Sequence, residues 1–262
     1  MHATRRFLAA AQGRHAPLFT LLAALVWIGS TILAQTTSGV ADPRLADPKL
    51  NAHAAIIQNN HYGHMPIPQM LADAHAKAPS KGVTWKGLQL TIHEHPTVVP
   101  PGTESAETTR LRSYQKQACQ ADAIAVGHIT ASAYHLSASG ATIYGDHIFV
   151  VDALLKDNQS SSIRQRPDII VTRPGGSLVL PEGPVNVDPE SFPRFQPDTT
   201  HLIFLKYIAE TSAYQAIDSF STLIARGNNW VIAAKPYSNL ALPGFTRGAL
   251  EATISSWLTS CK

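Results

Sequence analysis

The feature that most constrains the fold is a succession of short β-type segments between residues 121 and 233, separated by turn-forming residues. Within the segments, apolar residues either alternate with polar ones or occupy consecutive positions, so that both faces of the strand are apolar. Gly, Pro, Asn and Ser stand between the segments. Short strands at this spacing predict a mainly β fold, either a small closed OB-like β-barrel or a β-sandwich. The expected strands cover residues 121–136, 142–155, 168–172, 177–180, 201–208, 214–217, 221–225 and 230–233. At Gly127 the apolar residues of the first predicted strand change from one face to the other, as they do at a β-bulge.

Two helices and one further strand are expected around this β-rich part. Residues 88–93 alternate apolar and polar side chains and predict a strand, and residues 104–118 predict a helix. At the C-terminus, residues 247–260 place apolar side chains on one helical face, and Thr246 is positioned to cap that helix. We therefore expect a β-barrel domain over residues 85–262 with an amphipathic C-terminal helix packed on it.

The preceding residues, 35–84, are rich in Ala, His and Pro and lack a sustained hydrophobic period. Asp-Pro pairs at 42–43 and 47–48 and a Pro-Ile-Pro sequence at 66–68 interrupt any regular pattern. This composition predicts a loosely ordered spacer before the domain.

The N-terminal residues have the parts of an export signal. Three arginines accompany an apolar run over residues 18–28, and a small residue, Ala34, offers a cleavage point. The pattern predicts a signal peptide over residues 1–34 and a periplasmic or extracellular location. The alternative is an uncleaved anchor over residues 16–34, which would hold the protein in the inner membrane facing outward.

The net charge of +3, from 21 basic and 18 acidic residues, belongs to this N-terminal segment. Residues 1–34 contain three arginines and no acidic residue, so the remaining chain is balanced at 18 against 18. No Lys/Arg cluster with interleaved aromatic residues remains, and we expect no nucleic-acid partner. A membrane contact is expected only if residues 16–34 are retained.

The two cysteines, Cys119 and Cys261, stand before the first long strand and on the apolar face of the last helix. In an exported protein, a lone pair of cysteines most simply forms one disulfide. A reactive thiol would require a neighbouring base, and no such base is marked in the sequence.

Histidines are concentrated between residues 53 and 95, and two pairs have spacings seen in metal sites. His61 and His64 could share a helical face, and His93 and His95 would project from one side of a strand. A third ligand cannot be assigned, so we expect no cofactor and interpret the histidines as part of a polar spacer. The alternative is a metal-assisted hydrolase that uses the histidines of residues 53–95.

Common catalytic motifs are missing from the sequence. It contains no Gly-x-Ser-x-Gly, His-Glu-x-x-His or phosphate-binding glycine loop. Asp146 and His147 are adjacent, but neighbouring residues of a strand point to opposite faces and are poorly placed to pair. We therefore expect a non-catalytic protein.

Four segments carry a resemblance to a known fold. Residues 124–129 are followed by 149–151 with Leu155-Lys156, by 170–176 (Ile-Val-Thr-Arg-Pro-Gly-Gly) and by 202–205. Their order resembles uncharacterised exported bacterial proteins and the five-stranded OB-type barrel of netrin-like and tissue-inhibitor-of-metalloproteinase domains. The resemblance implies a fold. The inhibitors in this group act through a cysteine at the mature N-terminus, whereas Cys119 lies deep in the chain, so inhibition of proteases is not implied.

If the barrel is OB-like, one open face and its adjoining loops bind the ligand. The candidate segments are the turn at 174–177 and a proline-rich loop at 181–195. The residues expected there are Arg173, Ser177, Phe192 and Phe195. The phenylalanines could be exposed anchors, or they could pin the loop to the barrel. We expect an exported binding or structural module whose partner is a protein or a small ligand.

Overall fold

The structure of the protein, a computed structural model, describes eleven ranges of the chain: residues 35–36, 42–58, 66–77, 87–92, 106–159, 162–189, 192, 194–196, 198–217, 221–233 and 241–261. The expected export signal over residues 1–34 and the alternative anchor over 16–34 lie outside these ranges. No helix within the described ranges is long and apolar enough to cross a membrane.

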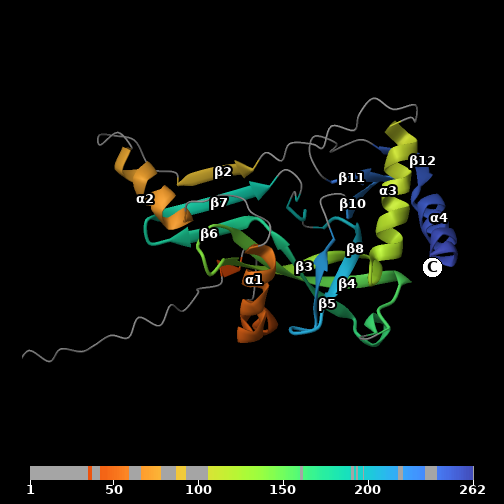
Figure 1. The fold of residues 1–262 in the computed structure, drawn as a ribbon, viewed down its shortest axis with the longest axis horizontal. Helices are drawn as coiled ribbons and strands as arrows, with labels where there is room; N and C mark the ends of the chain where they lie inside the picture. The colour runs from red at the N-terminus through yellow and green to blue at the C-terminus, as the bar shows by residue number, and fades with distance from the viewer. Residues whose placement is uncertain are drawn as a thin grey trace, which may run out of the picture. The chain divides into compact units, whose positions relative to one another are not determined.

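The described chain is mainly β and ends in a helix, which confirms the coarse fold expected from the sequence (Figure 1). The larger of its two sheets contains, in order of pairing, β1 (Gln35–Thr36), β3 (Ala123–Leu136), β4 (Ile143–Lys156), β5 (Asp168–Pro174), β9 (Ala213–Ala216), β8 (His201–Ile208), β10 (Thr222–Arg226), β11 (Asn229–Ile232) and β12 (Ala241–Thr246). Seven of these strands coincide closely with segments predicted from hydrophobic alternation and turn residues; β1 and β12 were not expected.

Five strands of the larger sheet close into a ring. Hydrogen-bonded pairs link β3 to β4, β4 to β5, β5 to β9 and β9 to β8, and β8 returns to β3. Only the β5–β9 pair is parallel. The ring closes because β8 uses both of its edges: Leu205 lies opposite Ala123 on one side and Ala216 on the other. Apolar side chains from all five strands fill the interior, among them Ala125, Phe149, Val171, Ile203 and Tyr214.

Gly127 lies at a register shift between β3 and β4, which confirms the predicted irregularity. A Cβ atom at this position would overlap the carbonyl oxygen of Val150 and the ring of Phe149. The close approach of two backbones therefore requires glycine here.

A smaller sheet lies beside the ring. It joins β2 (Leu88–Ile92) in parallel to β7 (Gly183–Pro189), and β7 in antiparallel to β6 (Gly176–Leu180). The sequence predicted a loop over 181–195, but residues 183–189 form a strand because Val185 and Val187 alternate into a buried cluster. The prolines of β7 stand near its two ends, where they interrupt few ladder hydrogen bonds.

The segment expected to be a loosely ordered spacer, residues 35–84, contributes β1 at its start and is largely helical over residues 43–58 and 67–77. It contains η1 (Pro43–Ala46), η2 (Pro48–Ala52), α1 (His53–Gln58) and α2 (Ile67–Lys77). Asp42 and Asp47 accept hydrogen bonds from backbone N–H groups two residues later, so each Asp-Pro pair begins a 3-10 helix. Leu45 packs on Ala133 and Ile148, on the face of the β3–β4 pair that points away from the interior of the ring. Burial of these side chains explains the difference from the expected spacer.

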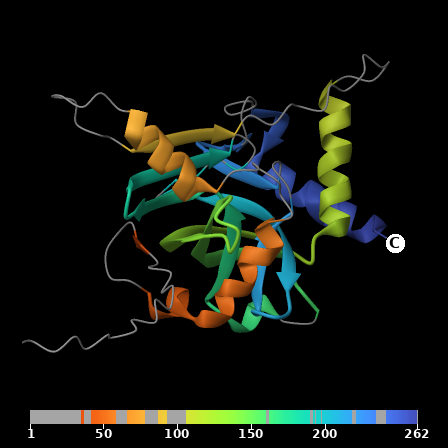
Figure 2. The same cartoon turned by 60° about the vertical axis from the view of Figure 1, so that its left-hand side comes forward.

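Helices α3 (Ala106–Gln120) and α4 (Arg247–Ser260) pack together over β8, β10 and β11 (Figure 2). Their shared core includes Tyr114, Phe204, Trp230, Leu250 and Ile254. The Thr246 hydroxyl accepts a hydrogen bond from the Ala249 N–H at 3.3 Å, which confirms the predicted cap of α4.

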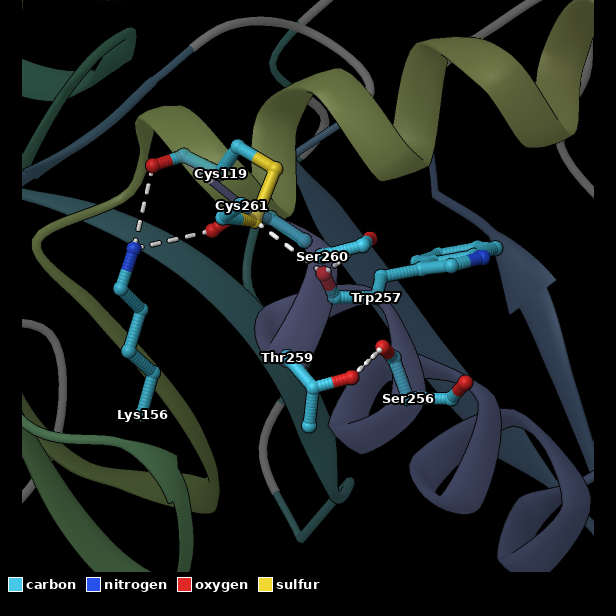
Figure 3. Close-up of a disulfide and its surroundings, with 8 residues drawn as sticks. Cys119, Lys156, Ser256, Trp257, Thr259, Ser260 and Cys261 are labelled. Carbon is cyan, nitrogen blue, oxygen red and sulfur yellow. Dashed lines mark hydrogen bonds between the residues drawn. A yellow bond between two sulfur atoms is a disulfide. The ribbon is translucent and has the colours of Figure 1, made fainter.

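The predicted disulfide between Cys119 and Cys261 is present and joins the C-terminal ends of α3 and α4 (Figure 3). Its Cα atoms lie 5.3 Å apart. The Lys156 ammonium, from β4, donates to the carbonyl oxygens of Ala118 and Cys119 at 3.1 Å each and so caps the last turn of α3.

Candidate functional site

Two polar clusters lie on opposite faces of β4, because Asp146 and His147 are consecutive residues of that strand. His147 points into the ring together with Phe149, and Asp146 points outward with Tyr144. We call His147, Arg173, Phe195 and His201 the inner cluster. We call His53, His135, Asp146 and Thr211 the outer cluster. The expectation that Asp146 and His147 do not pair is consistent with this geometry.

The inner cluster is organised around the ring of Phe195. The imidazoles of His147 and His201 meet this ring edge-on, with centroids 4.8 and 5.0 Å away and interplanar angles of 84°. The Arg173 guanidinium stacks 4.3 Å from the same centroid. The four side chains come from β4, β5, β8 and the segment that precedes β8. Three of them are buried, and Phe195 is partly exposed, so Phe195 is the side of the cluster nearest to solvent.

Burial determines the charge of the inner cluster. Desolvation, assisted by the positive charge of Arg173, lowers the pKa of His147 to about 3 and that of His201 to about 4. Both imidazoles are therefore neutral at neutral pH, and Nδ1 of His147 lies 2.7 Å from the Ser132 hydroxyl oxygen. Arg173 supplies the permanent charge of the cluster.

The residues predicted to bind ligand are only partly brought together. Arg173 lies near both phenylalanines, with its guanidinium carbon 5.7 Å from the Phe192 centroid. Phe192 is only 8% exposed and packs with the interior of the ring, as expected for a residue that pins a loop. Ser177 lies apart on β6, where its hydroxyl donates to Asn186 at 3.0 Å.

The histidines considered as metal ligands, His61, His64, His93 and His95, lie outside the described residues. Within the described ranges, no three His, Cys, Asp or Glu side chains are grouped to hold a metal ion.

The outer cluster joins the N-terminal segment to the ring. His53, the first residue of α1, places Nδ1 at 2.7 Å from an Asp146 carboxylate oxygen. Its other ring nitrogen, Nε2, lies 2.7 Å from the Thr211 hydroxyl oxygen. Nε2 of His135 lies 3.3 Å from the second oxygen of Asp146, an electrostatic contact that is not aligned as a hydrogen bond. The His135 ring stacks on Tyr144, with centroids 5.1 Å apart.

Opposing effects act on the Asp146 carboxyl, which is fully buried. Burial by itself raises the pKa of Asp146, but the contacts with His135 and His53 outweigh it and bring the pKa below its ordinary value. An ionised carboxylate only accepts hydrogen bonds, so Nδ1 of His53 carries a proton. In the neutral imidazole, Nε2 then accepts from the Thr211 hydroxyl, so two hydrogen bonds connect the three side chains in a row.

Sequence reasoning did not find the outer cluster. His53 was assigned to the spacer, and it is 93 residues away from Asp146. The available signal was the acidic residue at 146, close to the strand centre at 148–151 where both faces are apolar, because an acidic residue in a buried strand needs a partner.

Comparisons of the chain with models of protein families, with curated proteins and with solved structures find no match in any of the three.

Proposed function

We propose that the protein is an exported binding module built on an OB-type β-barrel, and that the inner cluster binds a small organic anion. The closed ring of five strands supports the barrel, since five strands in a closed Greek-key arrangement are the core of the OB fold. This is also the fold implied by the resemblance to netrin-like domains.

Export is supported by the chemistry of the cysteines. Cys119 and Cys261 are bonded in the structure, and disulfides persist mainly in oxidising compartments such as the periplasm or the extracellular space. The N-terminal export pattern favours the same location.

The observation that carries the binding proposal is the stack of Arg173, His147 and His201 around one partly exposed aromatic ring. A guanidinium presents N–H donors in a fixed plane that matches a carboxylate, and a neutral imidazole supplies a further donor. The Phe195 ring adds an apolar contact. These groups together suit a ligand that combines a carboxylate with an aromatic or apolar body.

Titration calorimetry with benzoate tests this proposal, because benzoate combines a carboxylate with an aromatic ring. We expect Arg173→Lys, which keeps the charge but loses the planar fork, to weaken binding by about tenfold. Arg164→Lys is the matched control, since the side chain of Arg164 is 77% exposed and lies outside the cluster. Saturable binding that is unchanged by Arg173→Lys, or no binding at all, would refute the proposed site.

The alternative expected from the sequence was a metal-assisted hydrolase that uses histidines of residues 53–95, and one observation favours instead a hydrolase that works without a metal. His53 is placed between Asp146 and Thr211 rather than beside a group of metal-ligating residues. Any hydrolytic chemistry at His53 would therefore proceed through these two side chains.

A further inference from the structure

We propose that Thr211, His53 and Asp146 form a site for acyl transfer, with Thr211 as nucleophile, His53 as general base and Asp146 as the group that orients His53. This activity goes beyond ligand binding and uses none of the residues of the inner cluster. It also departs from the non-catalytic protein that the absence of common motifs predicted.

The geometry matches the roles that such a site requires. A nucleophilic hydroxyl must lie within hydrogen-bond distance of a base, and the base must be held by a third group. Thr211 Oγ1 lies 2.7 Å from His53 Nε2, and His53 Nδ1 lies 2.7 Å from Asp146 Oδ1. The three residues come from the β8–β9 connection, α1 and β4, so the arrangement is recognised by geometry and not by a sequence motif.

Burial holds the base in one orientation. His53 and Asp146 are both fully buried, and His135 contacts the second oxygen of the carboxylate. A carboxylate that stays ionised stabilises the imidazolium formed when His53 takes up a proton. The lowered pKa of Asp146 supports this role.

Thr211 is the member of this trio that reaches solvent. It is partly exposed and lies in the turn between β8 and β9, whereas its two partners are fully buried. The next residue, Ser212, has φ of 56°, a left-handed conformation that is uncommon outside glycine. Residues held in such conformations are concentrated at functional sites, and here the conformation accompanies the turn that presents the hydroxyl.

The reaction balances with water as the only co-reactant. Thr211 Oγ1 bonds to the carbonyl carbon of an ester while its proton passes to His53 Nε2. The bond from that carbon to the leaving oxygen then breaks, and the leaving group takes the proton from His53. Water next gives a proton to His53 and its hydroxyl to the acyl carbon, which releases a carboxylic acid as the proton returns to Thr211. The substrate class is therefore small activated esters.

The test uses p-nitrophenyl acetate and the disulfide-bonded protein. We expect nitrophenol release with an acetyl group on Thr211, located by peptide mapping of the unmodified sequence. Thr211→Val should lower the rate by about 100-fold or more, and Thr211→Ser should retain activity because it keeps the hydroxyl. The matched control is Thr259→Val, an exposed threonine of α4.

Two results would overturn the proposal. One is the absence of nitrophenol release by the unmodified protein, a measurement that does not depend on whether any variant folds. The other is a rate for folded Thr211→Val that equals that of Thr259→Val. Benzoate binding depends on Arg173 and not on Thr211, so failure of either proposal is detected separately.

Discussion

Acidification tests the inner cluster through two histidines that the fold keeps neutral. Their pKa values in the folded protein are about 3 for His147 and about 4 for His201, because both are desolvated beside Arg173. In the unfolded chain, both histidines bind a proton near the ordinary pKa of 6.5. Between these values, the unfolded state holds more protons than the folded state, so the free energy of unfolding falls as the pH falls.

The size of the effect follows from the two pKa differences. At pH 5 each unfolded histidine is almost fully protonated and each folded one is almost fully neutral, which destabilises the fold by about 2 kcal/mol per residue. The two together remove about 4 kcal/mol between about pH 7.5 and about pH 5, a large fraction of the stability of an ordinary domain. The Asp146 carboxylate does not add to this loss, because its lowered pKa places its contribution below about pH 4.

Urea denaturation at several pH values, followed by circular dichroism, measures this loss. Replacing one histidine by Asn (His147→Asn or His201→Asn) should shrink the difference between pH 7.5 and pH 5 by about 2 kcal/mol, even if the variant is less stable at both values. His75→Asn, at an exposed position of α2, is the control and should leave the difference unchanged. If His147→Asn and His201→Asn both show the full loss of the unmodified protein, the assignment of buried neutral histidines is wrong.

Three further predictions concern stability, each measured by chemical denaturation at neutral pH. Replacing Cys119 and Cys261 by Ser should lower the free energy of unfolding by up to about 5 kcal/mol in the chain-entropy model, and an unchanged midpoint would contradict this. Gly127→Ala should destabilise by about 2 kcal/mol or more, because the added methyl overlaps backbone of β4. Gly248→Ala, in open space on α4, should instead stabilise by about 0.5–1 kcal/mol, and equal effects at the two glycines would refute the argument. Thr246→Ala should cost about 1 kcal/mol through loss of the α4 cap, whereas Thr246→Asp should restore most of it.

Features with a local cause could be predicted from the sequence. The strands over residues 123–136 and 143–156, the C-terminal helix and its Thr246 cap all depend on alternation, periodicity or a single capping residue. The disulfide was predictable because only two cysteines are present.

Features that depend on distant partners were not predicted. The parallel pairing of β5 with β9 leaves no mark within either strand. Residues 183–189 contain two prolines, which masked the alternation of Val185 and Val187. His53 lies in an Ala- and His-rich stretch, and only the folded chain brings it to Asp146 and Thr211.

The position of the disulfide decides how the protein responds to mechanical load. Cys119 lies in the last turn of α3 and Cys261 directly follows α4, so the covalent bond bridges the whole chain between them, the five-stranded ring included. When residues before α3 are pulled away from the C-terminus, the covalent path of the force runs along α3 and across the sulfur–sulfur bond, so the chain between the two cysteines, which contains β3–β12, cannot be extended. In a single-molecule pulling experiment, the oxidised protein should therefore show no extension from the chain between Cys119 and Cys261, which includes β3–β12 and α4, and reduction should add that length to the trace.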